Sequence, residues 1–241
     1  MTRLVDETLD ASPLGTALSR QPRRHRGLAG VVGLMSLLGL LGGCASSDDP
    51  TRYYQLLPVP VTAPAAAVPA YELVVDTVRL PEELDRAAMV VRHSPTQSRV
   101  LDDHRWLSPL SDQLTHTLVS NLQSALPQAW VRLPASPARA QQPRFGLRIE
   151  VEQMALSADA RVTLVASWTL LDAKNTVLRR DRAALEATAP ASSLTGTASS
   201  GRVDPDALAR AASQAVAQLA EQIAQSTLQA KLQEPTATSS R

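Results

Sequence analysis

Two places in the chain carry side chains suited to covalent or acid–base chemistry. Cys44 is the only cysteine among 241 residues, so its thiol has no disulfide partner within the chain and stays available for modification. His104 directly follows Asp102 and Asp103, and a hydrolase can use a histidine and a carboxylate as acid and base. The first place would attach a group to the protein, whereas the second would turn over a substrate.

The cluster around His104 has no supporting catalytic motif. The sequence contains no nucleophile elbow, no HExxH pattern and no glycine-rich phosphate loop. Adjacent charged residues on a connection are usually a solvated turn, and the histidines have no partner cysteines for a structural zinc site. We therefore expect no catalytic residue, no metal site and no cofactor, and keep a hydrolase that uses His104 as an alternative hypothesis.

The residues before Cys44 have the layout of an export signal. Four arginines between Arg20 and Arg26 precede an apolar run, Leu28–Leu41, which ends in two glycines. A helix of these 14 residues reaches only about 21 Å, short of the roughly 30 Å hydrocarbon core of a bilayer. The pattern predicts a signal peptide over residues 1–43 rather than a permanent spanning helix.

The quartet Leu41-Gly42-Gly43-Cys44 resembles the bacterial lipobox, in which the signal is cut before the cysteine and the new N-terminal residue is acylated. The resemblance implies a diacylglycerol group and an N-linked acyl chain on Cys44. Several acyl chains anchor a protein stably, because each buried methylene contributes about 0.8 kcal/mol. In enteric bacteria Asp after the cysteine favours inner-membrane retention, whereas Ala45 and Ser46 follow here. We therefore expect attachment to the outer membrane, facing the periplasm; a buried free cysteine is the alternative.

Composition argues against a nucleic-acid partner. The net charge is +1, and beyond residue 43 there are 19 Lys and Arg against 20 Asp and Glu. One Phe, three Trp and three Tyr are spread along the whole chain. The sequence thus offers neither a basic stripe nor an aromatic platform on which bases would stack.

The segment after the cysteine is typical of a tether. Residues 44–70 are rich in Pro, Ala and Ser, a composition that keeps a chain extended. Within this segment, the run Tyr53–Leu57 is β-prone and can pair with a sheet edge or dock on the domain. We expect a single folded domain over residues 71–230 and a disordered tail over residues 231–241.

Apolar alternation predicts the strands of this domain. They are expected at Tyr71–Pro81, Ala88–Arg92, Ser98–Trp106, Ala129–Leu133, Phe145–Leu156, Arg161–Asp172 and Thr176–Thr188, with a loop over Pro190–Arg202. The last three strands follow one another with turn residues at Asp172–Asn175, which favours antiparallel pairing.

Two helices complete the prediction. The first spans residues 109–126, with Ser108 as its cap, Pro109 at its first position and leucines at every fourth residue from Leu110. The second starts at Asp204-Pro205 and places six apolar residues on one face: Leu208, Ala212, Ala215, Val216, Leu219 and Ile223. We expect an α+β fold, a two-layer sandwich of a mostly antiparallel sheet with two main helices packed on it.

Four stretches in their order along the chain resemble the PqiC/YmbA family of ABC-type transport auxiliary lipoproteins. They are Tyr53-Tyr54-Gln55-Leu56; the run Leu80–Arg86 followed by Met89-Val90-Val91-Arg92; Arg105-Trp106 leading into the leucine-rich helix; and the closing alanine-rich helix. The resemblance covers most of the chain after Cys44.

The resemblance implies a lipoprotein of the outer membrane that works with an MCE-domain protein and inner-membrane transporter components in moving lipids between membranes, without an enzymatic step. Several anchored copies, as a possible homo-oligomer, would engage a ring-shaped MCE assembly multivalently. The resemblance also indicates seven candidate partner-binding residues: Tyr53, Tyr54, Leu84, Asp85, Arg86, Arg105 and Trp106. Packing of Leu84 and Trp106 in the core is the structural alternative, and a structural or assembly lipoprotein for a different outer-membrane machine is the functional one.

Overall fold

The computed structural model of the protein describes residues 50–61, 68–137, 142–189 and 204–233. The predicted signal peptide, Cys44 and the predicted loop Pro190–Arg202 lie outside these described residues.

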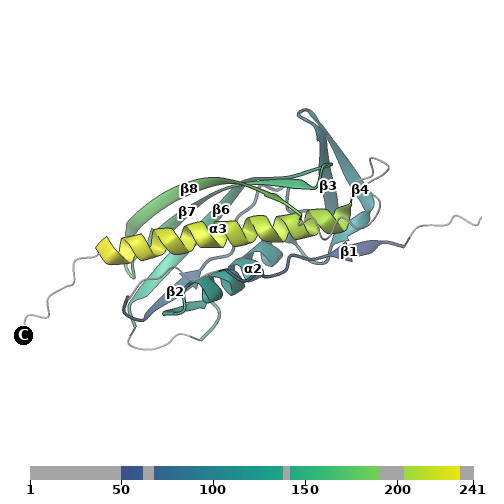
Figure 1. Ribbon diagram of the computed structural model, residues 1–241. Helices are drawn as coiled ribbons and strands as arrows, with labels where there is room; N and C mark the ends of the chain where they lie inside the picture. Colours follow the sequence, from purple (N-terminus) through teal and green to yellow (C-terminus); the bar gives the residue numbers. More distant parts are fainter. Residues whose placement is uncertain (1–49, 62–67, 138–141, 190–203, 234–241) are drawn as a thin grey trace, which may run out of the picture. The chain divides into compact units, whose positions relative to one another are not determined.

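The described strands form one mixed sheet (Figure 1). They are β1 (Arg52–Tyr54), β2 (Tyr71–Val75), β3 (Ala88–Ser94), β4 (Gln97–Trp106), β5 (Ala129–Arg132), β6 (Arg144–Ser157), β7 (Arg161–Leu171) and β8 (Val177–Thr188). The long strands β6, β7 and β8 are antiparallel to one another, as are β3 and β4. β1 pairs with β4 in parallel, β2 with β5 and β6, and β3 with β6. The α+β prediction is confirmed, and the parallel pairs are an addition to it.

Strand β6 has two partners along one of its edges. Its start, Arg144–Leu147, pairs with β2, and its end pairs with β3 only at Leu156 and Ser157. Between these two ladders, the backbone of Arg79 bonds to that of Ile149 and Val151. The sheet therefore forks where β2 and β3 separate.

A β-bulge in β6 changes which side chains face the helices. Val151 lies opposite Ala166 and Gln153 lies opposite Val165, so Glu152 is one residue too many for its partner strand. Side chains alternate along a strand, and the extra residue shifts the alternation by one. The core residues of β6 are accordingly Phe145, Leu147, Ile149 and Val151 before the bulge, and Met154 and Leu156 after it; Ala155 is also buried, outside this core.

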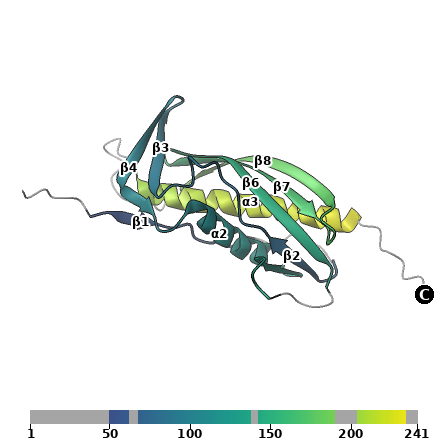
Figure 2. The same ribbon diagram turned by 180° about the vertical axis from the view of Figure 1, so that it is seen from behind.

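Helices α2 (Leu110–Ala125) and α3 (Pro205–Gln233) lie side by side on one face of the sheet (Figures 1 and 2). The predicted leucine face of α2 and the predicted stripe of α3 are buried in the core. One polar contact also joins α3 to the sheet. The Ser226 hydroxyl of α3 accepts a hydrogen bond from Trp168 Nε1 of β7 (3.2 Å) and donates one to the Asp181 carboxylate of β8 (2.5 Å). Within the part of the chain that is described, no helix is long and apolar enough to cross a bilayer.

Both ends of α3 can be compared with the prediction. Asp204 caps the helix as expected, since its Oδ1 accepts the N–H groups of Asp206 (3.0 Å) and Ala207 (3.3 Å). The helix continues to Gln233, so the predicted disordered tail from residue 231 begins too early. The reason is a tertiary contact: the Lys231 ammonium lies 4.4 Å from the ring centroid of Phe145.

Residues 55–61, which we call the strap, follow β1 and are bound to the two helices. The strap donates three backbone N–H groups to helix side chains: Leu56 to Gln113 (2.8 Å), Leu57 to Ser213 (3.0 Å) and Val59 to Asn121 (3.0 Å). Leu56 itself is buried in the core. The expected boundary of the folded domain at Tyr71 is therefore too late, because part of the expected tether is docked on the domain.

One core residue carries an unsatisfied hydroxyl. Tyr71 is fully buried, and its hydroxyl has no hydrogen-bond partner among the described residues. Its ring meets that of Phe145 edge to face at 5.7 Å. Burial raises the pKa of Tyr71 to about 12.

We expect Tyr71→Phe to raise the free energy of unfolding by about 1 kcal/mol at pH 7, because it removes a buried polar group that makes no hydrogen bond. The wild type should also lose stability as the pH rises from about 10 to about 12, since the unfolded chain releases the proton that the native chain retains. The variant should lack this loss. Urea unfolding at a series of pH values measures both effects.

Tyr53→Phe is the matched control, since Tyr53 is 60% exposed. It should leave both the stability and its pH dependence unchanged. A Tyr71→Phe variant less stable than the wild type would contradict the prediction.

Candidate functional site

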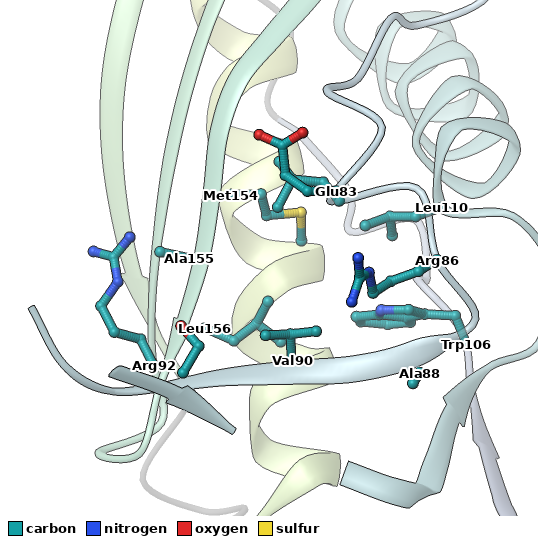
Figure 3. Close-up of a pocket in the computed structure, with 12 residues that line it drawn as sticks. Glu83, Arg86, Ala88, Val90, Arg92, Trp106, Leu110, Met154, Ala155 and Leu156 are labelled. Atoms are coloured by element: carbon teal, nitrogen blue, oxygen red, sulfur yellow. The ribbon is translucent and has the colours of Figure 1, made fainter. Parts of the chain in front are cut away.

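A pocket of about 280 Å³ opens where the sheet forks (Figure 3). Ala88, Val90 and Arg92 of β3 form one side, and Met154–Leu156 of β6 form another. The remaining lining comes from the loop between β2 and β3, from Ser98 and Trp106 near the two ends of β4, and from the first turn of α2. The fork itself creates this space, because β3 pairs with β6 only at one end of the pocket, where Val91 and Arg92 lie opposite Leu156 and Ser157.

The interior of the pocket is apolar. Trp106, Leu110, Met154 and Leu156 all belong to the hydrophobic core, yet each contributes to the pocket wall. Leu84, which is half-buried and packs against the same core, completes the apolar lining. The bulge in β6 is required for this surface, since it turns Met154 and Leu156 to the face that carries the core.

Charged side chains surround the apolar interior. Arg86 lies beside Trp106, and Arg92 lies at the opposite end of the lining, as Figure 3 shows. Glu83 is the third charged residue of the rim. Both arginines are exposed, and neither guanidinium makes an ion pair or a hydrogen bond with a residue that the structure describes.

Asp85, between these rim residues in the loop, binds the start of α2. Its Oδ1 accepts the backbone N–H of Ser111 (3.1 Å), and its Oδ2 accepts the Ser111 hydroxyl (2.9 Å). A carboxylate here satisfies a free N–H group and complements the helix dipole. The prediction that Ser108 caps α2 is wrong. Pro109 holds the N-cap position, and its side chain makes no capping hydrogen bond. The cap comes instead from 26 residues upstream.

The strand ladder next to the pocket joins the remaining predicted residues. Tyr53 lies opposite Arg105, and Tyr54 lies opposite Trp106 in the parallel pair of β1 and β4. Side chains of residues that lie opposite each other in the register point to the same face of the sheet. Tyr54 and Trp106 therefore share one face, and Tyr53 and Arg105 share the other. Arg105 donates to the carbonyl of Asp102 (3.3 Å) and is exposed.

Residues 54–224 match the model of the ABC-type transport auxiliary lipoprotein component family. The chain belongs to this family. It is 30% identical over 129 residues to the intermembrane transport lipoprotein PqiC of Escherichia coli (strain K12), which covers 53% of this chain and 67% of that protein. PqiC of Shigella flexneri matches to the same extent. As an auxiliary component, this lipoprotein works with other components of a transport system.

Two solved structures share the fold of the auxiliary lipoprotein. A crystal structure of an uncharacterised protein has a TM-score of 0.55 at 23% identity and covers 73% of this chain and 98% of its own. Protein XCC0632 from Xanthomonas campestris has a TM-score of 0.55 at 20% identity, with coverage of 76% and 97%. At this identity the likeness shows the fold alone.

The seven candidate residues of the auxiliary lipoprotein come together in one region. Leu84, Arg86 and Trp106 line the pocket, Asp85 fixes its loop, and the two tyrosines flank Arg105 and Trp106. Sequence reasoning missed the contribution of β6 to the wall. The motif at Met89–Arg92 was a usable signal for β3, whereas no local signal placed Met154 beside it, because the β3–β6 pair joins segments far apart in the chain.

The His104 cluster has a structural role in this arrangement. The Tyr54 hydroxyl lies 2.9 Å from His104 Nδ1, and the closest approach of His104 Nε2 to Asp103 is 3.6 Å, beyond hydrogen-bond length. Burial raises the pKa of Tyr54, which keeps its hydroxyl protonated. The contact joins β1 to β4. No group of three or more His, Cys, Asp or Glu side chains that could hold a metal ion occurs among the described residues.

Removing the remote cap should destabilise the protein without touching its core. We expect Asp85→Ala to lower the free energy of unfolding by about 1 kcal/mol, because the N–H of Ser111 loses its acceptor. Asp85→Asn should lose less, since its amide oxygen can still accept. Thermal or urea unfolding measures these differences.

Glu82→Ala is the control, since Glu82 is an exposed acidic residue of the same loop. It should leave the stability unchanged. Equal stability of Asp85→Ala and the wild type would contradict the capping role.

Proposed function

We propose that this protein is the outer-membrane-anchored accessory subunit of an MCE/ABC-type intermembrane lipid transport system, attached through acylated Cys44 and facing the periplasm. It binds an MCE-domain protein and thereby connects the transporter components of the inner membrane with the outer membrane. This function maintains the integrity of the envelope and includes no enzymatic step.

One observation carries the proposal: the family-motif residues, which are scattered from Tyr53 to Trp106 along the sequence, converge on the pocket and the adjoining β1–β4 ladder. Leu84 and Trp106 are largely accounted for by packing, and Asp85 is accounted for by the helix cap. Arg86 is different, because it is exposed and its guanidinium makes no ion pair or hydrogen bond with a described residue. An exposed, unpaired guanidinium beside an apolar pocket supports a binding role.

Charge reversal at Arg86 tests partner binding. We expect the wild-type lipoprotein, isolated from its native envelope, to carry with it an MCE-domain protein encoded in the same genome. Arg86→Glu should lower the recovered MCE protein at least fivefold, because a buried interface tolerates an unpaired charge poorly. Quantitative immunoblotting against equal amounts of lipoprotein measures the ratio.

Arg180→Glu is the matched control, since Arg180 is an exposed arginine on β8, away from the pocket. It should leave the recovery unchanged. If the wild type recovered no MCE protein and instead brought down components of another outer-membrane machine, the accessory-subunit role would be wrong.

Acylation has a separate test. We expect Cys44→Ala to prevent lipid attachment, so that the protein fails to incorporate labelled palmitate and no longer fractionates with the outer membrane. The uncleaved signal should also lower its electrophoretic mobility. A variant with the mobility, label and membrane fraction of the wild type would show that Cys44 is not the attachment point.

A further inference from the structure

The pocket at the fork combines an apolar lining with charged residues on its rim. Its apolar lining combines half-buried Leu84, Ala88 and Val90 with four core residues, which are only 3–5% exposed: Trp106, Leu110, Met154 and Leu156. Its rim carries Arg86 and Arg92, whose guanidinium groups have no ion pair or hydrogen bond within the described part of the chain. An open apolar surface beside unpaired cations is expected where a ligand supplies both an apolar part and a negative charge.

The charges on the rim define the head group of such a ligand. A guanidinium presents a planar fork of donors that matches a carboxylate or a phosphate. Arg86 sits directly beside the indole of Trp106 at the mouth of the apolar interior (Figure 3). Glu83 lies on the same rim and repels a second negative charge. The rim therefore favours a head group that carries a single negative charge.

The size and polarity of the interior define the rest of the ligand. At about 280 Å³ the pocket is slightly smaller than typical ligand sites of about 300–1,000 Å³, so it holds one slender group rather than a whole lipid. The lining offers few side-chain donors or acceptors inside the rim; Ser98 is the uncharged polar side chain of the lining. A peptide backbone entering this space would leave polar groups unpaired, whereas an alkyl chain has none.

We infer that the fork pocket binds a single-chain amphiphile with a singly charged anionic head group. The alkyl end lies between Trp106 and Met154, and the head group binds Arg86. This inference goes beyond the proposed function, because docking of a protein partner requires no small ligand. The purified lipoprotein suffices for its test, and the result does not depend on the presence of an MCE partner.

The experiment titrates octanoate into the full-length acylated protein held in phosphatidylcholine nanodiscs and follows tryptophan fluorescence, since Trp106 lines the pocket. Octan-1-ol serves as the uncharged probe of equal length, and N-acetyl-leucyl-glutamate amide serves as the peptide probe. We expect saturable binding of octanoate and at least tenfold weaker binding of octanol, because a charge-assisted hydrogen bond is lost.

Two variants locate the site, and one serves as a control. Arg86→Gln should weaken octanoate binding about tenfold and leave octanol binding unchanged. Ala88→Phe should abolish the binding of both alkyl probes by filling the pocket, and Arg180→Gln should bind like the wild type. The inference is overturned if octanoate shows no saturable binding, if octanol binds as tightly, if the peptide binds more tightly than octanoate, or if both pocket variants keep wild-type affinity.

Discussion

Along one edge of a strand, each residue can pair with only one neighbouring strand. One edge of β6 is shared by two neighbouring strands, β2 and β3. β2 occupies its first residues and β3 its last, with Arg79 bonded to the edge between them, so the chain after Arg79 leaves the sheet and returns to it in β3. That excursion brings the loop with Arg86 over the end of β6 and places Asp85 against the first turn of α2. The pocket, the helix cap and the position of Trp106 all depend on this shared edge.

The strap is a second constraint, because its backbone N–H groups require hydrogen-bond acceptors on the two helices. Gln113, Asn121 and Ser213 are buried polar residues on helix faces that are mostly apolar. Each accepts a backbone N–H group from the strap, and these hydrogen bonds explain why polar side chains occupy core positions. Their loss would leave both the side chain and the strap backbone unsatisfied.

Periodicity was sufficient to predict the long elements, because the residues of β6, β7, β8 and both helices alternate or repeat according to local rules. It was insufficient wherever distant segments decide the outcome. The parallel pairs, the bulge at Glu152, the cap from Asp85 and the last turn of α3 all depend on contacts across the fold. The candidate site followed the same division: the motifs on the loop and β4 were found, whereas the wall at Met154 was not.

The docking of β1 and the strap on the domain also limits how far the domain can lie from its point of attachment. A lipid anchor at Cys44, as proposed, would leave eight residues to Arg52, where β1 is held by β4, and such a segment spans at most about 29 Å. A free segment up to Tyr71 would have reached roughly 97 Å. The pairing of β1 with β4 thus shortens the free tether about threefold. The domain would stay close to the membrane that anchors it, and any component arriving from the opposite membrane would have to cross nearly the whole gap itself.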